Sequence, residues 1–183
     1  MRLKSIVECK PVEVLSDPLL DQVEKTYNSS FPESERRSFG LVRDLVKAEP
    51  RFVVYALLKE DVYVGFITAW LFDKFTYVEH FAIDESARNG GLGADAMKQF
   101  LASCGTPVVL EVEMPDDEMS KRRVGFYERL GFVLDHHPYR QPPYRKGEEW
   151  LDMRLMTYRI QDMADCYEQV KGCIYKYVYL VEL

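Results

Sequence analysis

The chain has 183 residues, 47% of them hydrophobic and 13% aromatic, which is enough for one domain with a buried core and excludes a disordered chain. A formal net charge of -6 argues against nucleic acid as a partner, because phosphate binding needs a surplus of Lys and Arg. No apolar run approaches the roughly 18 residues that span a bilayer, and the charged opening MRLKSIVECK lacks the apolar segment of a secretory signal, so we expect a cytoplasmic protein with no membrane partner.

Helical patterns dominate the first part of the chain. Asp17 is a capping residue, Pro18 suits the first position of a helix, and apolar residues follow at helical spacing, so we predict a helix over 17–27. The polar, proline-interrupted segment that comes next predicts a loop. A second helical pattern covers 39–46, and Pro50 ends it.

Beyond this point the sequence changes to β-branched and aromatic runs. RFVVYALLKE, VYVGFITAWLF and FTYVEHFAID are separated by turns of only a few residues, so we predict three successive strands, mostly antiparallel. The remaining pattern predicts, in order, a helix over 92–104, a strand over 108–114, a helix over 119–130, a strand over 132–135, a loop over 135–149, a strand over 150–160, and a helix with an apolar tail over 161–183.

The stretch RNGGLGADA raises the question of what its glycines allow to approach the backbone. Its letters fit the dinucleotide pattern G-x-G-x-x-A, with Gly91, Gly93 and Ala96, and also the pattern R-x-x-G-x-G, which begins at Arg88. A dinucleotide fold needs its first glycine directly after a strand, but seven residues, DESARNG, separate Ile83 from the first glycine of that pattern. We therefore set the dinucleotide interpretation aside.

The second pattern suits an anion site at the start of a helix. Main-chain N–H groups of residues 89–94, together with the positive end of the helix dipole, can hold a diphosphate without a large basic patch. Gly91 and Gly93 let phosphate oxygens reach the main chain, and Arg88 adds one positive charge. A glycine-rich turn that only starts the helix fits these residues as well.

A second motif decides between these two interpretations. The strand YVEHFAID, the R-x-x-G-x-G loop, the strand LEVE and the helix FYERLGF follow one another as in the GNAT acetyltransferase superfamily, which the chain resembles over roughly residues 5 to 158. The resemblance implies an α/β fold with a mixed, mostly antiparallel sheet, a splayed parallel strand pair and flanking helices. It also implies an acetyltransferase domain over 1–158, with a C-terminal helix and tail over 159–183 packed on the same domain.

The same resemblance implies acetyl-CoA as co-substrate. In the superfamily, the strand before the glycine loop offers main-chain groups to the pantetheine arm, and the loop holds the diphosphate. The implied contacts are Phe81, Ala82 and Ile83 for the pantetheine, and Arg88, Asn89, Gly90, Gly91, Leu92, Gly93 and Ala94 for the diphosphate. Many members carry an Asn after the fifth strand, but MPDDEMSKRR stands at that place here, so that contact is absent or replaced.

Acetyl transfer to an amine needs a proton for the departing thiolate, a polarised thioester carbonyl and a neutral amine. Tyr127 in FYERLGF matches the family's general acid, and a phenol stays protonated at neutral pH. The alternative for Tyr127 is a core aromatic, which we expect of Phe126 and Phe132. A main-chain N–H of the strand in 75–84, where the parallel neighbour splays away, would polarise the carbonyl.

Three carboxylates are candidates for deprotonating the amine: Glu79, Glu111 and Glu113. Alternation along the strand places Glu79 on the same side as Phe81 and Ile83, where a carboxylate is unexpected unless it is paired or functional. Burial there would raise the pKa of Glu79 toward that of a useful base. The alternatives are a structural hydrogen bond for Glu79 and, for Glu113, the binding of a cationic substrate.

We predict no metal site. The four cysteines show no C-x-x-C spacing and are expected as free thiols, and the adjacent His136 and His137 cannot easily share a metal. The segments HHPYRQPPYRKG and FPESERRS are expected to form walls of the acceptor site, because loops held by a rigid sheet usually carry specificity.

We therefore predict an acetyl-CoA-dependent N-acetyltransferase that acts on a primary amine of a small molecule or peptide by direct attack, with Tyr127 as the acid and Glu79 as the leading base candidate. Two alternatives stay open: an acyl-CoA-binding regulatory module that has lost catalysis, and an enzyme that uses a longer acyl-CoA. The sequence also leaves the acceptor and the oligomeric state open.

Overall fold

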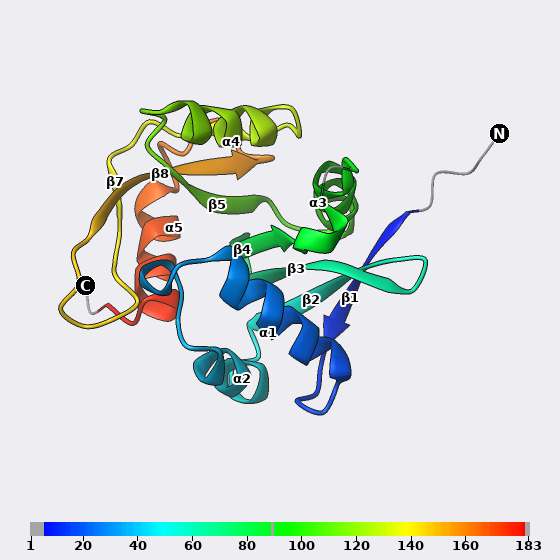
Figure 1. Cartoon of the computed structure of the whole chain (residues 1–183). Helices are drawn as coiled ribbons and strands as arrows, with labels where there is room; N and C mark the ends of the chain where they lie inside the picture. The colour runs from blue at the N-terminus through cyan, green and yellow to red at the C-terminus, as the bar shows by residue number, and fades with distance from the viewer. Residues whose placement is uncertain (1–5, 89, 182–183) are drawn as a thin grey trace.

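A computed structural model describes residues 6–88 and 90–181 of the protein (Figure 1). The strands are β1 (Val7–Val12), β2 (Phe52–Lys59), β3 (Val62–Leu71), β4 (Thr76–Ile83), β5 (Val108–Glu113), β6 (Val133–Leu134), β7 (Tyr139–Gln141) and β8 (Leu151–Tyr158). The helices are α1 (Pro18–Ser30), α2 (Phe39–Ala48), α3 (Leu92–Ser103), α4 (Glu118–Glu128) and α5 (Tyr167–Cys173), with 3₁₀ turns η1 (Glu33–Glu35) and η2 (Glu85–Ala87) and a π-helical turn η3 (Ile174–Val178).

The strands form one mixed sheet. Their spatial order is β1-β2-β3-β4-β5-β8-β6, and β7 pairs with β8. Every neighbouring pair is antiparallel except β4 and β5, which are parallel and joined through α3. The predicted fold, a mostly antiparallel mixed sheet with one parallel pair and flanking helices, is confirmed.

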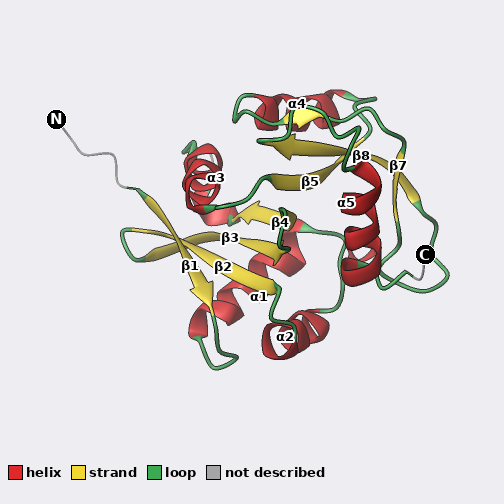
Figure 2. Ribbon diagram, turned by 180° about the vertical axis from the view of Figure 1, so that it is seen from behind, coloured by secondary structure: helices red, strands yellow, loops and turns green. Residues whose placement is uncertain are grey.

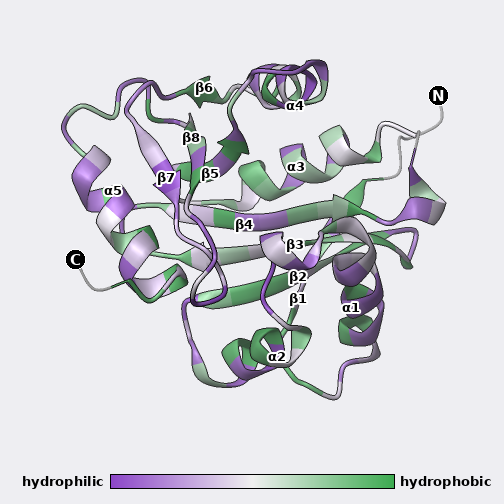
Figure 3. Cartoon of the chain, turned by 60° about the vertical axis from the view of Figure 1, so that its left-hand side comes forward, coloured by the Kyte–Doolittle hydropathy of each residue, from purple (hydrophilic) through white to green (hydrophobic). Residues whose placement is uncertain are grey.

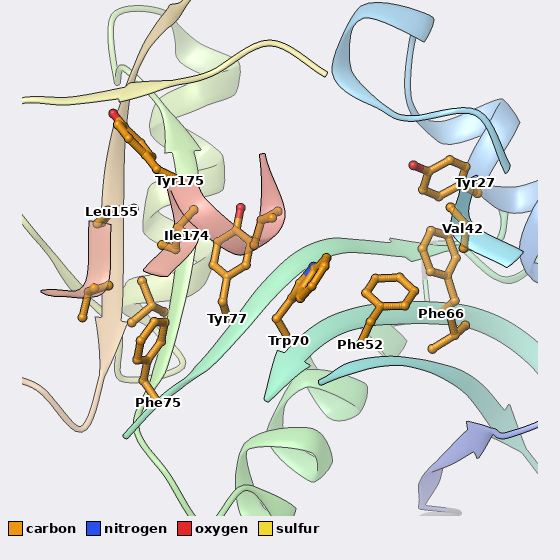
Figure 4. Close-up of a cluster of buried hydrophobic side chains, with 14 of the residues drawn as sticks. Tyr27, Val42, Phe52, Phe66, Trp70, Phe75, Tyr77, Leu155, Ile174 and Tyr175 are labelled. Carbon is orange, nitrogen blue, oxygen red and sulfur yellow. The ribbon is translucent and has the colours of Figure 1, made fainter. Parts of the chain in front are cut away.

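Helices cover both faces of this sheet (Figure 2). On one face, α1, α2 and α5 with η3 enclose a core that includes Tyr27, Phe66, Trp70 and Ile174 (Figure 4). On the other face, α3 and α4 enclose a second core, in which Phe100 is 1% exposed. No helix among the described residues is both long and apolar enough to cross a membrane.

Local signals determine where the predicted helices begin. The Asp17 side chain accepts the N–H of Leu19 at 2.9 Å, directly before Pro18, and the Ser38 side chain caps α2. Asp117 forms a capping box at the start of α4. The four predicted helices before residue 131 and the three-strand run occur within a few residues of their expected bounds, whereas the C-terminal helix begins only at Tyr167 and continues as the π-helical turn η3.

Two strands are absent from the sequence-based prediction. β1 is a charged edge strand that pairs with β2 alone among the described strands, and β7 lies inside the segment expected as a loop. β1 mixes charged and apolar residues and β7 has only 3 residues, and both depend on pairing with a distant strand, so local periodicity does not reveal them. Figure 3 shows a further departure from a simple pattern, a hydrophilic stretch that interrupts β4, whereas β2 is mostly hydrophobic.

Candidate active site

β4 and β5 are paired only at their starts. The parallel ladder runs from Thr76–Val108 to Val78–Leu110 and ends there. Beyond this point β4 continues along β3 and β5 continues along β8, so the two strands diverge (Figure 1). The main chain of β4 past Val78 therefore has no strand partner on the β5 side, and its polar groups require other partners.

A bulge lies at the point where the strands diverge. Thr68 of β3 is opposite His80, but Ala69 is opposite Val78, so Glu79 is the extra residue in β4. The Glu79 side chain contacts Trp70 on the α1/α2 face, whereas Phe81 packs with the core on the α3/α4 face. The expectation that Glu79 shares a side with Phe81 and Ile83 is therefore wrong, because the bulge breaks the alternation.

The carboxylate of Glu79 is fully paired inside the protein. It forms an ion pair with Arg37, and it accepts hydrogen bonds from Trp70 Nε1 at 2.8 Å and from the Tyr144 hydroxyl at 3.0 Å. Burial is the largest single influence and raises the pKa of Glu79, but the charges of Arg37 and His80 and the hydrogen bonds from Trp70 and Arg37 together outweigh it. The pKa therefore lies below the ordinary glutamate value and not above it as expected. The side chain is 0% exposed although the residue as a whole is only partly buried, so its main chain is the accessible part.

Glu111 is the corresponding buried carboxylate on β5. It accepts hydrogen bonds from the Tyr139 hydroxyl, from Gln141 Nε2 at 2.6 Å and from the Tyr179 hydroxyl at 2.8 Å. Burial raises the pKa of Glu111, and these hydrogen bonds oppose the rise without cancelling it. Tyr179 lies directly after η3, so the C-terminal segment contributes to this part of the site.

The glycine loop ends in a backbone conformation that favours glycine. Gly91 caps α3 with φ of +72°, in the left-handed region, and no side chain of the described residues caps the helix there. The first-turn N–H groups of a helix have no partner within the helix itself. Arg88 Nε donates to the Ile83 carbonyl at 3.2 Å. Asn89 lies outside the described residues.

The gap between the diverging strands holds a cavity, here called the β4–β5 cleft. It is lined by Phe81, Ala82, Ile83 and Arg88, and by Tyr127 of α4. Burial raises the pKa of Tyr127 to about 12, and the nearby charge of Arg123 opposes that rise, so the phenol is protonated at neutral pH. The cleft therefore brings both expected catalytic residues, Tyr127 and Glu79, together with several expected cofactor residues.

A second cavity, here called the side cavity, adjoins the cleft. Its volume is about 260 Å³, and Gln141, Tyr144, Leu151 and Met153 line it. Six residues line both cavities: Phe31, Glu35, Glu79, His80, Glu111 and Arg123. Both segments expected as walls of the acceptor site contribute, FPESERRS through Glu35 and HHPYRQPPYRKG through Tyr144.

A separate apolar cavity of about 510 Å³ lies between the β3–β4 turn and α5, lined by Phe72 and Tyr177 among others. None of the residues of the β4–β5 cleft lines it. Size alone does not make it the reactive centre, because it contains neither the diverging ends of β4 and β5 nor the glycine-rich start of α3.

The site geometry agrees with a sequence comparison. A profile of the Acetyltransferase (GNAT) family matches residues 19–132. The chain belongs to the GNAT acetyltransferase family. This membership confirms the predicted acyltransferase class, with acetyl-CoA as the co-substrate. A search of curated proteins found no match.

Solved structures of GNAT proteins have the same fold. A GNAT-family protein from Bacteroides thetaiotaomicron is 36% identical and has a TM-score of 0.92, and the match covers 96% of this chain and 99% of that one. Naa50 from Arabidopsis thaliana, in complex with the bisubstrate analogue CoA-Ac-MVNAL, is 19% identical with a TM-score of 0.60 and coverages of 84% and 99%. A GNAT acetyltransferase from Elizabethkingia anophelis with acetyl-CoA bound is 16% identical with a TM-score of 0.55 and coverages of 83% and 97%. The last two likenesses concern the fold alone.

The GNAT site also contains residues that the sequence did not single out. Arg37 and Tyr144 surround Glu79, and Gln141 and Tyr179 surround Glu111. A carboxylate on an apolar strand signals that a partner exists, because an unpaired buried charge is costly. The signal does not say which residue that partner is. Among the described residues, no group of three or more His, Cys, Asp or Glu could hold a metal ion.

Proposed function

We propose that this GNAT protein transfers the acetyl group of acetyl-CoA to a primary amine of a small molecule or peptide, by direct attack of the amine on the thioester. One observation carries the proposal. The gap opened by the divergence of β4 and β5 is continuous with a carboxylate-lined cavity on one side and contains Tyr127 on the other.

The cofactor contacts follow from main-chain groups that need partners. In this proposal the unpaired main chain of Phe81, Ala82 and Ile83 binds the pantetheine amides. Residues 88–94 bind the diphosphate through the positive helix start and the charge of Arg88. The left-handed conformation of Gly91 supports this assignment, since it turns the chain into α3 without a side chain at the anion site.

The chemistry divides among three groups. Tyr127 donates its proton to the departing thiolate, which a phenol with a raised pKa can do throughout the neutral range. A main-chain N–H at the β4 bulge polarises the carbonyl. Glu79 was expected as the base because of its side of the strand and a raised pKa, and neither reason holds. In this proposal Glu79 instead positions the bulge.

The acceptor in this proposal is a cation. Glu35, Glu113 and Asp152 line the side cavity with the buried Glu79 and Glu111, whereas Arg123 is its only Lys or Arg among the described residues. Arg123 is itself 3.1 Å from Glu113. A positively charged amine is drawn to such a surface, and an anionic acceptor is repelled.

The test is an acceptor screen with the purified protein, in which release of CoA thiol is followed with cadaverine, spermidine, tyramine and a peptide with a free N-terminus. We expect turnover with at least one of these amines. Tight acetyl-CoA binding without any turnover would favour an acyl-CoA-binding regulatory module. Faster turnover with a longer acyl-CoA would favour an enzyme that uses a longer acyl group. Acetylation of anionic acceptors alone would contradict the proposed charge preference.

A further inference from the structure

The wall shared by the β4–β5 cleft and the side cavity contains three carboxylates: Glu35, Glu79 and Glu111. A group that accepts a proton from the amine must stand at this junction, because the amine enters from one cavity and the thioester lies in the other. The hydrogen bonds of the three carboxylates distinguish them.

Two of the three are saturated by protein donors. Glu79 is ion-paired with Arg37 and accepts two further hydrogen bonds, and its side chain is 0% exposed. Glu111 accepts three hydrogen bonds from Tyr139, Gln141 and Tyr179. To bind a substrate ammonium, either carboxylate would have to exchange a buried partner for it.

Glu35 is different. In the described ranges 6–88 and 90–181, no residue donates a hydrogen bond to its carboxylate or forms an ion pair with it, and the residue is exposed to solvent. Its main chain is nevertheless held in place, because the Glu35 carbonyl lies 3.1 Å from Nε2 of the buried His80. Arg37, two residues further on, anchors the same segment to Glu79. The loop is thus preorganised around one carboxylate that is available to substrate.

The charges around Glu35 suit a proton acceptor. Although Glu35 is exposed, neighbouring protein atoms at the cavity wall displace part of its hydration. This desolvation and the neighbouring carboxylate of Glu113 raise the pKa of Glu35, and the charge of Arg123 opposes the rise without cancelling it. His80 faces the Glu35 carbonyl and not its carboxylate. A glutamate with a raised pKa is a stronger base than an ordinary one.

We propose that Glu35 is the general base that takes a proton from the acceptor ammonium. This inference rests on the proposed acetyl transfer and adds the residue that activates the amine. The ammonium gives one proton to a carboxylate oxygen of Glu35, and its neutral nitrogen then forms a bond to the thioester carbonyl carbon. The C–S bond breaks, and the CoA thiolate takes the proton of Tyr127. The nitrogen, now bonded to the acetyl carbon, gives a second proton to the tyrosinate of Tyr127, and Glu35 releases its proton to solvent.

The test compares Glu35→Gln with Glu33→Gln, using the best acceptor of the amine screen. Glu33 belongs to the same turn, but its side chain is 79% exposed, lies 3.8 Å from Arg145 and lines neither cavity. We expect Glu35→Gln to lower kcat/KM for the amine by about 10²-fold or more at pH 7, on the scale of general base catalysis, with unchanged acetyl-CoA affinity in calorimetry. Glu33→Gln should match the wild type.

The pH dependence separates a base from a merely structural residue. As the pH approaches the amine's own pKa, near 10.4 for a lysine-like amine, the substrate no longer needs a base and the gap between Glu35→Gln and wild type should close. A deficit that stays constant with pH, or a Glu35→Gln rate equal to wild type at pH 7, would overturn the assignment of Glu35 alone. Absence of turnover in the wild-type protein would overturn the proposed function and this inference together.

Discussion

The guanidinium of Arg37 forms an ion pair with the Glu79 carboxylate, whose side chain is completely buried at the β4 bulge. The same guanidinium also lies 3.4 Å from the Val178 carbonyl of η3. One arginine therefore links the loop that carries Glu35, the strand that bounds the cleft and the C-terminal segment. The position of the acceptor loop depends on this link.

Replacing Glu79 with Gln should destabilise the fold. The change leaves the buried Arg37 without an opposing charge, which costs about 3 kcal/mol in a buried pair. Because the folded pKa of Glu79 lies below the ordinary value of 4.5, the wild-type advantage is fully present above that pH and shrinks as the pH falls below it. Urea unfolding at pH 7 and at pH 3 measures both effects.

The control for that measurement is Glu24→Gln, which removes a partly exposed ion pair with Arg43. It should change the free energy of unfolding by less than about 1 kcal/mol. An equal decrease in the free energy of unfolding in the two variants would mean that the buried ion pair stabilises the fold no more than a surface pair does.

Gly93→Val should weaken acetyl-CoA binding far more than it lowers stability. A Cβ at Gly93 would lie 3.6 Å or more from Ile83, Phe126 and Phe81, so the fold can accept it, while the added methyl groups would crowd the diphosphate. Loss of one hydrogen bond to a phosphate costs about 1.5–3 kcal/mol, or roughly tenfold or more in Kd. Calorimetry with acetyl-CoA and a thermal unfolding curve provide the comparison.

Gly40→Val is the matched control, because Gly40 is likewise the second residue of its helix and has open space around it. This variant should keep wild-type affinity. If Gly93→Val also keeps it, the loop does not bind the cofactor.

Tyr127→Phe should leave folding and acetyl-CoA affinity nearly unchanged, because the ring and its edge contacts with Phe126 and Phe132 remain. Loss of the hydroxyl removes the proton donor to the thiolate. Turnover should therefore fall by about 10²- to 10⁴-fold with little change in the KM for acetyl-CoA. Steady-state kinetics of thiol release measures the effect.

Tyr55→Phe serves as the control, since Tyr55 packs against Phe100, away from the cleft, and should keep full turnover. Wild-type turnover in Tyr127→Phe would indicate that water protonates the thiolate.

Tyr179→Phe should impair acceptor binding and not cofactor binding. The hydroxyl of Tyr179 donates to Glu111 and accepts from Gln141 Nε2, so its loss leaves two buried groups each short of a partner. We expect stability to fall by about 1–3 kcal/mol, the KM for the amine to rise, and the Kd of acetyl-CoA to stay constant. The control is Tyr177→Phe, because Tyr177 packs against Phe72 and lines neither the β4–β5 cleft nor the side cavity; it should leave the KM for the amine unchanged. Equal KM values in both variants would exclude the C-terminal segment from acceptor recognition.

Most of the fold could be predicted from short-range sequence patterns. The strands from Phe52 to Ile83 are runs of β-branched and aromatic residues joined by short turns, and two helices begin at the Asp17 and Ser38 caps. These signals depend only on residues close together in the chain, so the sequence is enough to detect them. The glycine loop and the position of Tyr127 were predictable for the same reason, since each lies in a compact motif.

The sequence by itself determined the order of elements, the GNAT motifs and the presence of carboxylates that need partners on two apolar strands. Tertiary structure alone decided how those carboxylates are used. The partners of Glu79 lie as far as 65 residues away and those of Glu111 as far as 68, and no local pattern encodes such pairings. One extra residue in β4 also turned Glu79 toward Arg37, because side chains alternate with a period of two and a single insertion moves a residue to the opposite face.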